Sequence, residues 1–366
     1  MKRLLCILSN MNAGGAETFL MKVYRNIDKS KYQFDFCVNV QERCYYENEI
    51  ENLGGKLYRI PSKSDDLKAF KKKLTNIIKE NDYRYVLRIT ANAAGLLDLK
   101  VAKKAGAQRC IARSSNSNSE GSIKNKIVHI LGKELYLKYV DVGIAPSNLA
   151  AEYTFGKKMV EKGRISIVHN ALDIDVYKFN KNGRTKIRNE FGIKNDFIVI
   201  GNVGRFMTQK NHKRIIEIFE EIHLMNLKTV LMLVGNGELE KEIKKDISEK
   251  GLQESVVFTG VRSDIPDLLS AMDVMLMPSF YEGMPNTVIE AQATGLPCVI
   301  SDTITREANI TGLVKYISLL DQNNVWAKEV LSTNINNRIE TKRMFIENSY
   351  NISAVVKQFE NIVFGE

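Results

Sequence analysis

The fold of this chain is decided by residues 273–302, which read DVMLMPSFYEGMPNTVIEAQATGLPCVISD. The apolar run 274–277 has the length of a strand and ends at Pro278. Gly and Pro residues then keep the chain irregular until a helix can begin near Asn286, and Gly295 ends that helix before a second apolar run. The stretch therefore predicts a strand, a loop, a helix, a turn and another strand.

Two carboxylates accompany this pattern. Glu282 lies in the loop, and Glu290 lies about one turn into the helix. The N–H groups of a helix that opens onto a Gly/Pro loop at the carboxyl end of a strand form an anion-binding site. We therefore expect phosphate at the loop and hydroxyl groups on the two carboxylates.

The composition predicts two globular domains. A chain of 366 residues exceeds the size at which one core stops growing, and its hydrophobic content is 44%. The five cysteines show no CxxC spacing, which argues against a disulfide framework or a zinc site and favours a reducing cytosol. The apolar run in the first ten residues, MKRLLCILSN, is too short to span a bilayer and predicts a strand.

The net charge of +10 is unevenly distributed. Residues 101–170 hold twelve Lys and Arg against five Asp and Glu, a net charge of +7. Such a segment attracts phosphates, anionic lipid headgroups or nucleic acid, and the alternative is a solvated basic face. Nucleic acid is disfavoured because no stacking aromatics are interleaved and no nucleic-acid-binding motif is visible.

Strands and helices alternate along the chain, which predicts parallel sheets covered by helices on both faces. A domain boundary is expected between residues 164 and 196, where the pattern changes. Residues 112–122 are expected to form a polar loop, His129 to have a structural role, and Ser147 to cap a helix. Strands are predicted at residues 3–8, 34–38, 56–59, 85–89, 142–145, 165–168, 197–203, 229–234, 255–259 and 274–277.

In the second half, four loops follow predicted strands and can converge on one ligand at the carboxyl edge of the sheet. Arg205 and Lys210 supply positive charge, and the helix beginning near Asn286 adds N–H donors, which together suit a diphosphate. For any one of these residues alone, a surface salt bridge is the alternative. The loops are 204–210, 235–237, 260–262 and 279–287.

Arg205 and Lys210, followed by the segment EGMPNTVIE from Glu282 to Glu290, resemble the basic pair and E-x7-E signature of retaining glycosyltransferases of family four. The resemblance covers nearly the whole chain and is closest to the bacterial branch that builds capsular polysaccharides and exopolysaccharides. Its other motifs are GGAE at 14–17, PSNLAAEYTFG from 146, VHNALDIDVY from 168 and SDTITREANIT from 301.

The resemblance implies an α/β fold with two Rossmann-like, doubly wound domains facing a cleft, the glycosyltransferase-B arrangement. Residues 1–170 would bind the acceptor and residues 171–345 the nucleotide sugar. Residues 346–366 would form a helix that packs back toward the first domain.

The resemblance also implies roles for individual residues. Arg205 and Lys210 would neutralise the diphosphate, Glu282 would hold the donor-sugar hydroxyls, and Glu290 the ribose hydroxyls. No metal or other cofactor is implied, because Arg and Lys can replace Mg²⁺ electrostatically, and Asp173-Ile-Asp175, the only D-x-D, is expected to be structural. The other donor-binding residues would be Gly14, Gly15, Gly204, Gly237, Arg262, Gly283, Met284, Asn286 and Thr287.

The implied reaction is a front-face transfer with retention from a nucleotide-diphosphate sugar, with UDP favoured over GDP. The acceptor would be a glycan or a polyprenyl-diphosphate-linked saccharide in bacterial surface polysaccharide synthesis. We expect a cytoplasmic protein that docks peripherally on the anionic inner face of the cell membrane and binds no nucleic acid.

The match departs from the family in the first domain, where relatives usually carry histidines. The corresponding places here read LRIT at 87–90 and ARSSN at 112–116. Arg113 or Asn116 would take over the acceptor contacts, or this loop has no role. The alternatives are a nucleotide-sugar-binding subunit weakened in catalysis, and an epimerase or phosphorylase of the same fold.

Overall fold

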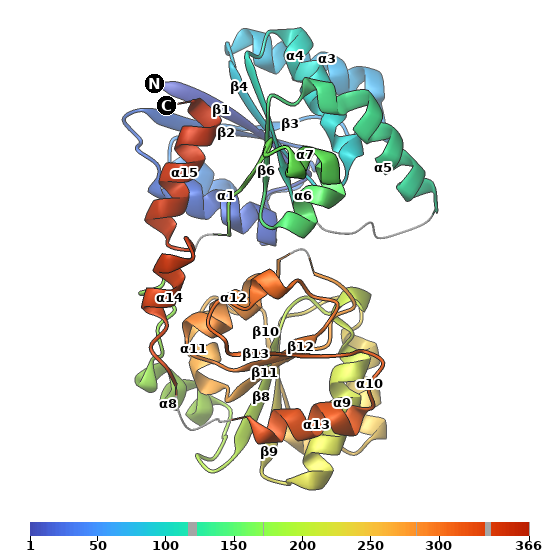
Figure 1. The fold of residues 1–366 in the computed structure, drawn as a ribbon, viewed down its shortest axis with the longest axis vertical. Coiled ribbons are helices and arrows are strands. Elements are labelled where there is room, and N and C mark those ends of the chain that lie inside the picture. Colours follow the sequence, from blue (N-terminus) through green and yellow to red (C-terminus); the bar gives the residue numbers. More distant parts are fainter. Residues whose placement is uncertain (116–122, 171, 283, 334–337, 366) are drawn as a thin grey trace. The chain divides into compact units, whose positions relative to one another are not determined.

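The computed structural model describes residues 1–115, 123–170, 172–282, 284–333 and 338–365 (Figure 1). Two compact units make up the chain. Unit 1 comprises Met1–Ala171 together with Ser349–Glu366, and unit 2 comprises Leu172–Asn348. Each unit is an α/β layer structure built on one parallel sheet.

Within the described residues, unit 1 holds a seven-stranded sheet in the order β3-β2-β1-β4-β5-β6-β7. Its strands are β1 (Lys2–Ile7), β2 (Tyr32–Val38), β3 (Leu57–Arg59), β4 (Tyr85–Thr90), β5 (Arg109–Ser114), β6 (Val142–Ala145) and β7 (Ile165–Ile167). Its helices are α1 (Gly15–Asn26), α2 (Glu47–Asn52), α3 (Leu67–Glu80), η1 (Ala93–Leu96), α4 (Leu97–Ala105), α5 (Ile123–Tyr136), η2 (Leu137–Tyr139), α6 (Asn148–Phe155), α7 (Lys157–Glu161) and α15 (Ile352–Phe364).

Both faces of this sheet are buried, and the side-chain alternation of β1 shows why. Leu4 and Cys6 enter the cluster beneath α1 and α15, whereas Leu5 and Ile7 enter the cluster beneath α3, α4 and α6. Figure 1 shows α1 and α15 on one side of the sheet and α3 and α4 on the other. The run Leu4–Ile7 of β1 is therefore apolar on both faces of the strand.

The prediction of a loop at residues 112–122 is wrong for its first three residues. Ala112, Arg113 and Ser114 belong to β5 and are fully buried. The guanidinium of Arg113 lies over the Phe19 ring, 3.7 Å from its centroid, and the Ser114 hydroxyl hydrogen-bonds Thr154 at 2.6 Å. The polar residues of this strand therefore find partners in the core and give no apolar signal in the sequence.

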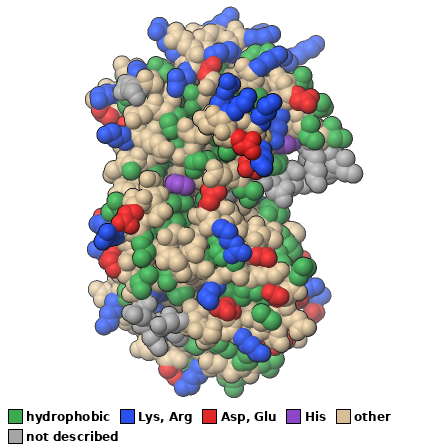
Figure 2. All heavy atoms as spheres, in the orientation of Figure 1, with side chains coloured by type: hydrophobic (Ala, Val, Ile, Leu, Met, Phe, Trp, Pro, Cys, Tyr) green, Lys and Arg blue, Asp and Glu red, His purple; other side chains and the backbone are tan. Residues whose placement is uncertain are grey.

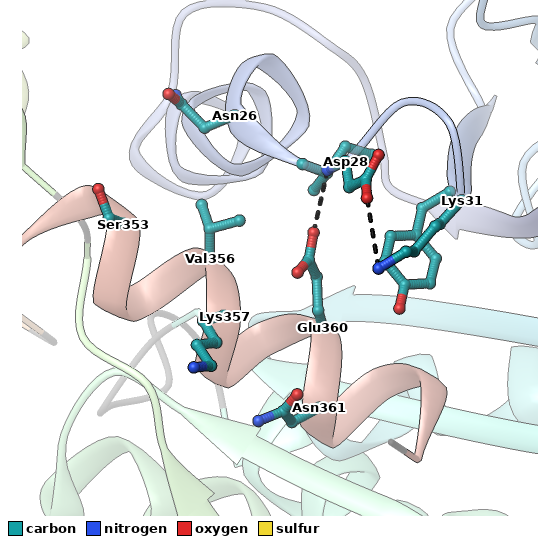
Figure 3. Close-up of a pocket in the computed structure, with 10 residues that line it drawn as sticks. Asn26, Asp28, Lys31, Ser353, Val356, Lys357, Glu360 and Asn361 are labelled. Atoms are coloured by element: carbon teal, nitrogen blue, oxygen red, sulfur yellow. Dashed lines mark hydrogen bonds and ion pairs between the residues drawn. The ribbon is translucent and has the colours of Figure 1, made fainter.

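Helix α15 returns the chain to unit 1. Phe359 packs edge-on against Phe19, and Phe364 stacks on Tyr32 with ring centroids 4.2 Å apart. The Asp28 N–H donates to Glu360 Oε1 at 3.1 Å beside a cavity of about 520 Å³ (Figure 3). Part of the cavity lining immediately precedes β2, at the amino-terminal edge of the sheet, opposite to the edge where parallel sheets bind ligands.

Unit 2 holds a six-stranded parallel sheet, over the residues described, in the order β10-β9-β8-β11-β12-β13. Helices α9, α10 and α13 pack on one face and α8, α11 and α12 lie on the other (Figure 1). The strands are β8 (Ile198–Val203), β9 (Thr229–Val234), β10 (Val256–Gly260), β11 (Val274–Met277), β12 (Cys298–Ser301) and β13 (Val314–Ile317). The helices are α8 (Lys181–Glu190), η3 (Thr208–Lys210), α9 (His212–Met225), α10 (Glu240–Glu249), η4 (Gln253–Ser255), α11 (Ile265–Ala271), α12 (Asn286–Ala293), η5 (Arg306–Ala308), α13 (Asn323–Ser332) and α14 (Lys342–Glu347).

One buried carboxylate, Asp273, ties α8 to the sheet of unit 2. Its Oδ1 accepts from Arg184 Nη2 at 2.7 Å, and its Oδ2 accepts from Arg188 Nη2 at 2.5 Å and from the Val199 N–H at 2.7 Å. Arg188 is 1% exposed and Asp273 is 4% exposed. The charge of each group is therefore compensated inside the protein and not by water.

Helix α9 begins with a buried histidine. His212 is 2% exposed, packs edge-on against the Phe206 ring, and has no hydrogen-bond partner on either ring nitrogen among the described residues. Burial lowers its pKa from the ordinary 6.5 to about 4. The folded protein therefore holds this ring neutral where an unfolded chain would protonate it.

Replacing Asp273 with Ala should lower the free energy of unfolding of unit 2 by about 3–5 kcal/mol, because Arg188 would remain buried and unpaired. The fluorescence of Trp326, the only tryptophan of the chain and fully buried in α13, reports the unfolding of this unit in urea. Asp196→Ala, which removes an exposed ion pair with Lys228, is the matched control and should leave the transition unchanged. Equal transitions for wild type and Asp273→Ala would contradict this role.

The stability of unit 2 should fall as the pH falls from about 6.5 to about 4. In this range His212 is protonated in the unfolded chain but stays neutral in the folded unit. The loss attributable to this ring is about 3 kcal/mol. Urea unfolding followed by Trp326 fluorescence at a series of pH values measures it. His212→Gln should flatten the curve. Identical curves for wild type and His212→Gln would overturn the assignment.

Candidate active site

The loops that follow β8 and β11 are joined at the point where the strand order of unit 2 reverses. Asn202 Nδ2 donates to the Leu276 carbonyl at 2.8 Å, the Phe280 N–H donates to the Gln209 carbonyl at 3.0 Å, and Asn211 Nδ2 donates to the Pro278 carbonyl at 3.0 Å. This edge of a doubly wound sheet is the usual ligand site. The two loops therefore present one preformed surface there.

Lys210 and Glu282 meet on this surface. Lys210 Nζ donates to Glu282 Oε1 at 2.7 Å, and the two side chains are 14% and 9% exposed. Gln209 Nε2 donates to the Tyr281 carbonyl at 2.8 Å and lies 3.4 Å from Glu282 Oε2. Lys210 and Glu282, predicted separately, thus form one part-buried, oriented ion pair.

The glycines of this region let three backbones approach closely. A Cβ at Gly237 would lie 2.3 Å from the Phe206 carbonyl oxygen, and one at Gly204 would lie 3.1 Å from Lys210 Cε. Gly235 has φ of 132°, and its N–H donates to the Gly260 carbonyl at 2.9 Å. The loops after β8, β9 and β10 are therefore in backbone contact, as glycine alone allows.

The two predicted arginines of unit 2 differ in their surroundings. Arg205 is 71% exposed, and its ion pair with Glu238 is long at 3.7 Å, so that pair holds it weakly. Arg262 donates to Glu190 Oε1 at 2.6 Å and to Asp264 Oδ1 at 2.8 Å, and the Asp264 hydrogen bond raises its pKa. The structure thus leaves Arg205 at the surface and places Arg262 in a link between α8 and the start of α11.

The N-terminus of α12 follows the Glu282 loop. Met284 is buried at 8% exposure, Asn286, Thr287 and Glu290 are half-buried, and Gly283 lies outside the described residues. No side chain caps α12, and the Thr287 hydroxyl is buried without a hydrogen-bond partner among the described residues. The N-terminus of α12 therefore places polar groups at the same edge of the sheet as Lys210.

The predicted donor-binding glycines of unit 1 precede α1. Gly14 is the N-terminal flanking residue and makes no side-chain cap, and Gly15 is the first residue of the helix. A Cβ at position 14 would lie 2.3 Å from Glu17 Oε2, so that carboxylate folds back over the loop. Burial raises the pKa of Glu17. A side chain at position 14 would therefore displace the Glu17 carboxylate.

Arg113, one of the two residues expected to take over the acceptor contacts, is buried and does not contribute a surface charge to the basic segment. Arg113 is 1% exposed, its Nη2 donates to Asn170 Oδ1 at 2.6 Å, and burial lowers its pKa to about 9. Such a side chain cannot touch a membrane. Asn116, the other acceptor residue considered, lies outside the described residues.

His129 is structural, as predicted from its isolation. Its Nδ1 accepts from the Ala93 N–H at 3.0 Å, its Nε2 lies 3.0 Å from the Tyr153 carbonyl oxygen, and its ring stacks on Tyr153. The accepting Nδ1 assigns the proton to Nε2, and burial lowers the pKa of the ring. Across the part of the chain that the structure describes, no three His, Cys, Asp or Glu side chains are grouped as metal ligands.

Sequence comparison connects the chain to known transferases. The pattern that defines the family described as Glycosyl transferases group 1 matches residues 183–351. EpsF of Bacillus subtilis (strain 168), which is named as a glycosyltransferase, is 35% identical over 90% of this chain and 87% of its own length.

Two further relatives carry more specific names. The UDP-Gal:alpha-D-GlcNAc-diphosphoundecaprenol alpha-1,3-galactosyltransferase of Escherichia coli is 30% identical over 63% of this chain and 60% of its own. The capsular polysaccharide biosynthesis glycosyltransferase CapH of Staphylococcus aureus is 24% identical over 86% of this chain and 85% of its own.

Among solved structures, Anabaena Alr3699/HepE in complex with UDP and glucose is similar over all of both chains, with a TM-score of 0.79 and 16% identity. That likeness concerns the fold, whereas the EpsF match concerns the sequence of nearly the whole chain. The family expected from the E-x7-E motif is confirmed: this chain belongs to the group 1 glycosyltransferases and is a transferase enzyme with the glycosyltransferase-B fold.

Proposed function

We propose that the enzyme transfers a sugar, with retention of anomeric configuration, from a UDP-sugar to a lipid-linked saccharide in bacterial surface polysaccharide synthesis. The observation that carries this proposal is the part-buried Lys210–Glu282 pair at the ligand edge of unit 2. A cation beside an oriented carboxylate suits a sugar diphosphate, whose charge needs the lysine and whose hydroxyls need hydrogen-bond acceptors.

UDP is favoured over GDP as the donor nucleotide by two relatives. The Escherichia coli relative is named for UDP-Gal, and the Anabaena protein of similar fold was solved with UDP and glucose. Glu290, half-buried in α12, would take the ribose hydroxyls, and Gly14 and Gly15 of unit 1 would approach the phosphates by their backbone. CapH supports surface polysaccharide as the product class.

The chemistry would be a front-face displacement. The leaving diphosphate oxygen accepts the acceptor proton as the bond from the anomeric carbon to that oxygen breaks and the new glycosidic bond forms on the same face. Lys210 and Arg205 stabilise the charge that develops on the diphosphate, and Glu282 orients the donor sugar. These two cations take the electrostatic role that a divalent ion has elsewhere, so we propose activity without a metal.

Lys210→Ala and Glu282→Gln should each reduce turnover at least about hundredfold, because each removes half of the oriented pair. Arg205→Ala should reduce it about tenfold or more. The assay mixes purified enzyme with UDP- and GDP-sugars in the presence of EDTA and follows nucleotide release, including slow hydrolysis without acceptor, while NMR of the product reports its anomeric configuration.

Lys228→Ala, an exposed lysine of the same unit, is the matched control and should turn over as wild type. An Arg205→Ala/Lys210→Ala double variant with normal turnover would refute the assignment. Saturable binding of UDP-sugars without any sugar release would instead identify a binding subunit, and release only with metal present would refute metal independence.

We also propose that unit 1 docks peripherally on an anionic membrane. No helix in the described ranges is long and apolar enough to span a bilayer. Helix α3 carries five exposed lysines, at positions 68, 71, 72, 73 and 79. Figure 2 shows Lys and Arg side chains gathered over the part of unit 1 where α3 and α4 lie, and α5 exposes Ile127 and Ile130 at 52% and 57%.

Flotation with phosphatidylglycerol vesicles at moderate salt tests this docking. Wild-type protein should rise with the vesicles, and Lys71→Glu/Lys72→Glu should largely remain below, because each reversed charge removes attraction of about 1 kcal/mol or more. Lys241→Glu/Lys245→Glu in α10 has the same charge change in unit 2 and should float as wild type. Wild-type protein that stays wholly at the bottom would contradict the proposal.

A further inference from the structure

The loop that follows β11 has no regular secondary structure, so its backbone groups need partners outside the loop. The Pro278 carbonyl accepts from Asn211 Nδ2 at 3.0 Å. The Ser279 carbonyl accepts from Ser301 Oγ at 2.5 Å and from Thr303 Oγ1 at 3.1 Å. The start of the loop is therefore fixed to the segments that follow β8 and β12.

Gln209 holds the next part of this loop by both its main chain and its side chain. Its carbonyl accepts from the Phe280 N–H at 3.0 Å, and its Nε2 donates to the Tyr281 carbonyl at 2.8 Å. The same amide nitrogen lies 3.4 Å from Glu282 Oε2, which is long for a hydrogen bond. One glutamine therefore contacts three successive residues of the loop.

A short, tight turn places Gln209 at this point. Gln209 is the middle residue of η3, and Asn211, which follows η3, has φ of 57°. Few residues other than glycine adopt this left-handed conformation, and asparagine is among those that do so most readily. Lys210 Nζ donates to Glu282 Oε1, and Gln209 Nε2 approaches Glu282 Oε2. Neighbouring side chains of the turn therefore contact the two oxygens of one carboxylate.

These two contacts of Glu282 differ in what they can do. Lys210 neutralises the charge of the carboxylate, whereas the amide of Gln209 has no net charge and can only orient it. The last torsion of a glutamate side chain has a broad energy minimum, so an ion pair alone leaves the plane of the carboxylate loosely defined. A second donor beside the other oxygen restricts that rotation.

We infer that Gln209 is a positioning residue for sugar transfer, which fixes the Glu282 loop and the plane of its carboxylate. The inference rests on the proposed function, in which Glu282 orients the donor sugar. Gln209 acts through Glu282 and is assigned no contact of its own with the sugar or the diphosphate. Its loss should therefore slow transfer more than it weakens binding of the nucleotide.

Gln209→Leu tests this role, because leucine has similar bulk but no side-chain donor. Turnover of the UDP-sugar should fall about tenfold or more, whereas the affinity for UDP, which has no sugar, should stay within about twofold of wild type. Nucleotide release and calorimetric titration with UDP measure the two quantities. Gln253→Leu, which removes an exposed glutamine of η4 bonded to Ser248, is the matched control and should retain wild-type turnover.

Gln209→Glu supplies a second readout, the dependence of turnover on pH. An ionised carboxylate at position 209 would repel Glu282 Oε2 and the Tyr281 carbonyl, whereas a protonated one can donate as the amide does. Lys210 can neutralise only one of the two carboxylates, so the other should have a raised pKa. Turnover of Gln209→Glu relative to wild type should therefore rise severalfold as the pH falls from about 8.5 to about 6.5, a range above the one in which His212 destabilises unit 2. The ratio for Gln209→Leu should not change with pH.

A Gln209→Leu variant that turns over like wild type would overturn the inference. Equal losses of UDP affinity and turnover in that variant would also overturn it, because they mark a general disturbance of the site. A pH-independent ratio for Gln209→Glu counts against it in the same way, and this series decides alone if the Trp326 fluorescence of Gln209→Leu shows that the variant does not fold. Wild-type enzyme that binds UDP-sugar without releasing sugar refutes the proposed function and this role with it, whereas normal turnover in both wild type and Gln209→Leu refutes only the role of Gln209.

Discussion

The second unit depends on the contact between Asp273 and two arginines of α8. The carboxylate accepts hydrogen bonds from two guanidinium groups and from the Val199 N–H near the start of β8. Because Asp273 immediately precedes β11, the same contact sets where that strand begins. The strand then delivers Glu282 to the ligand edge, so a structural ion cluster at one end of β11 determines the position of a catalytic candidate at the other.

The Lys210–Glu282 pair, like Asp273 and its arginines, brings opposite charges together where water has little access. The two side chains are 14% and 9% exposed, and each charge reduces the free-energy cost of removing the other from water. A diphosphate that approached Lys210 would share that lysine with Glu282, and Glu282 could in turn accept hydroxyl hydrogens of the sugar. Without ligand, Lys210 and Glu282 therefore compensate each other's charge, and the protein avoids the free-energy cost of a desolvated, unpaired lysine.

Much of the fold could be predicted from apolar runs, and the exceptions have physical causes. Strands β9 and β11 have the predicted bounds, because both are continuous apolar segments ended by Gly or Pro. Strand β5 is absent from the predicted strands, because Arg113 and Ser114 are buried through a ring contact and a hydroxyl pair that no sequence pattern reveals. Helix α10, with the sequence EKEIKKDISE, buries only Ile243 and Ile247 and was not predicted at all.

The sequence likewise predicts some contacts of the candidate site and not others. That Lys210 and Glu282 would meet follows from loops placed at one switch point, whereas the capture of Arg262 by Glu190 depends on side chains distant in sequence.

The return of α15 makes unit 1 discontinuous, and this has a consequence for how the protein is made. Phe359 reaches Phe19 only after all of unit 2 has been synthesised, so the apolar face of α1 waits uncovered while the ribosome translates residues 172–348. Unit 2, by contrast, is continuous in sequence and can close its core first. During translation the apolar face of α1 is therefore exposed for longer than the core of unit 2, until α15 emerges and covers it.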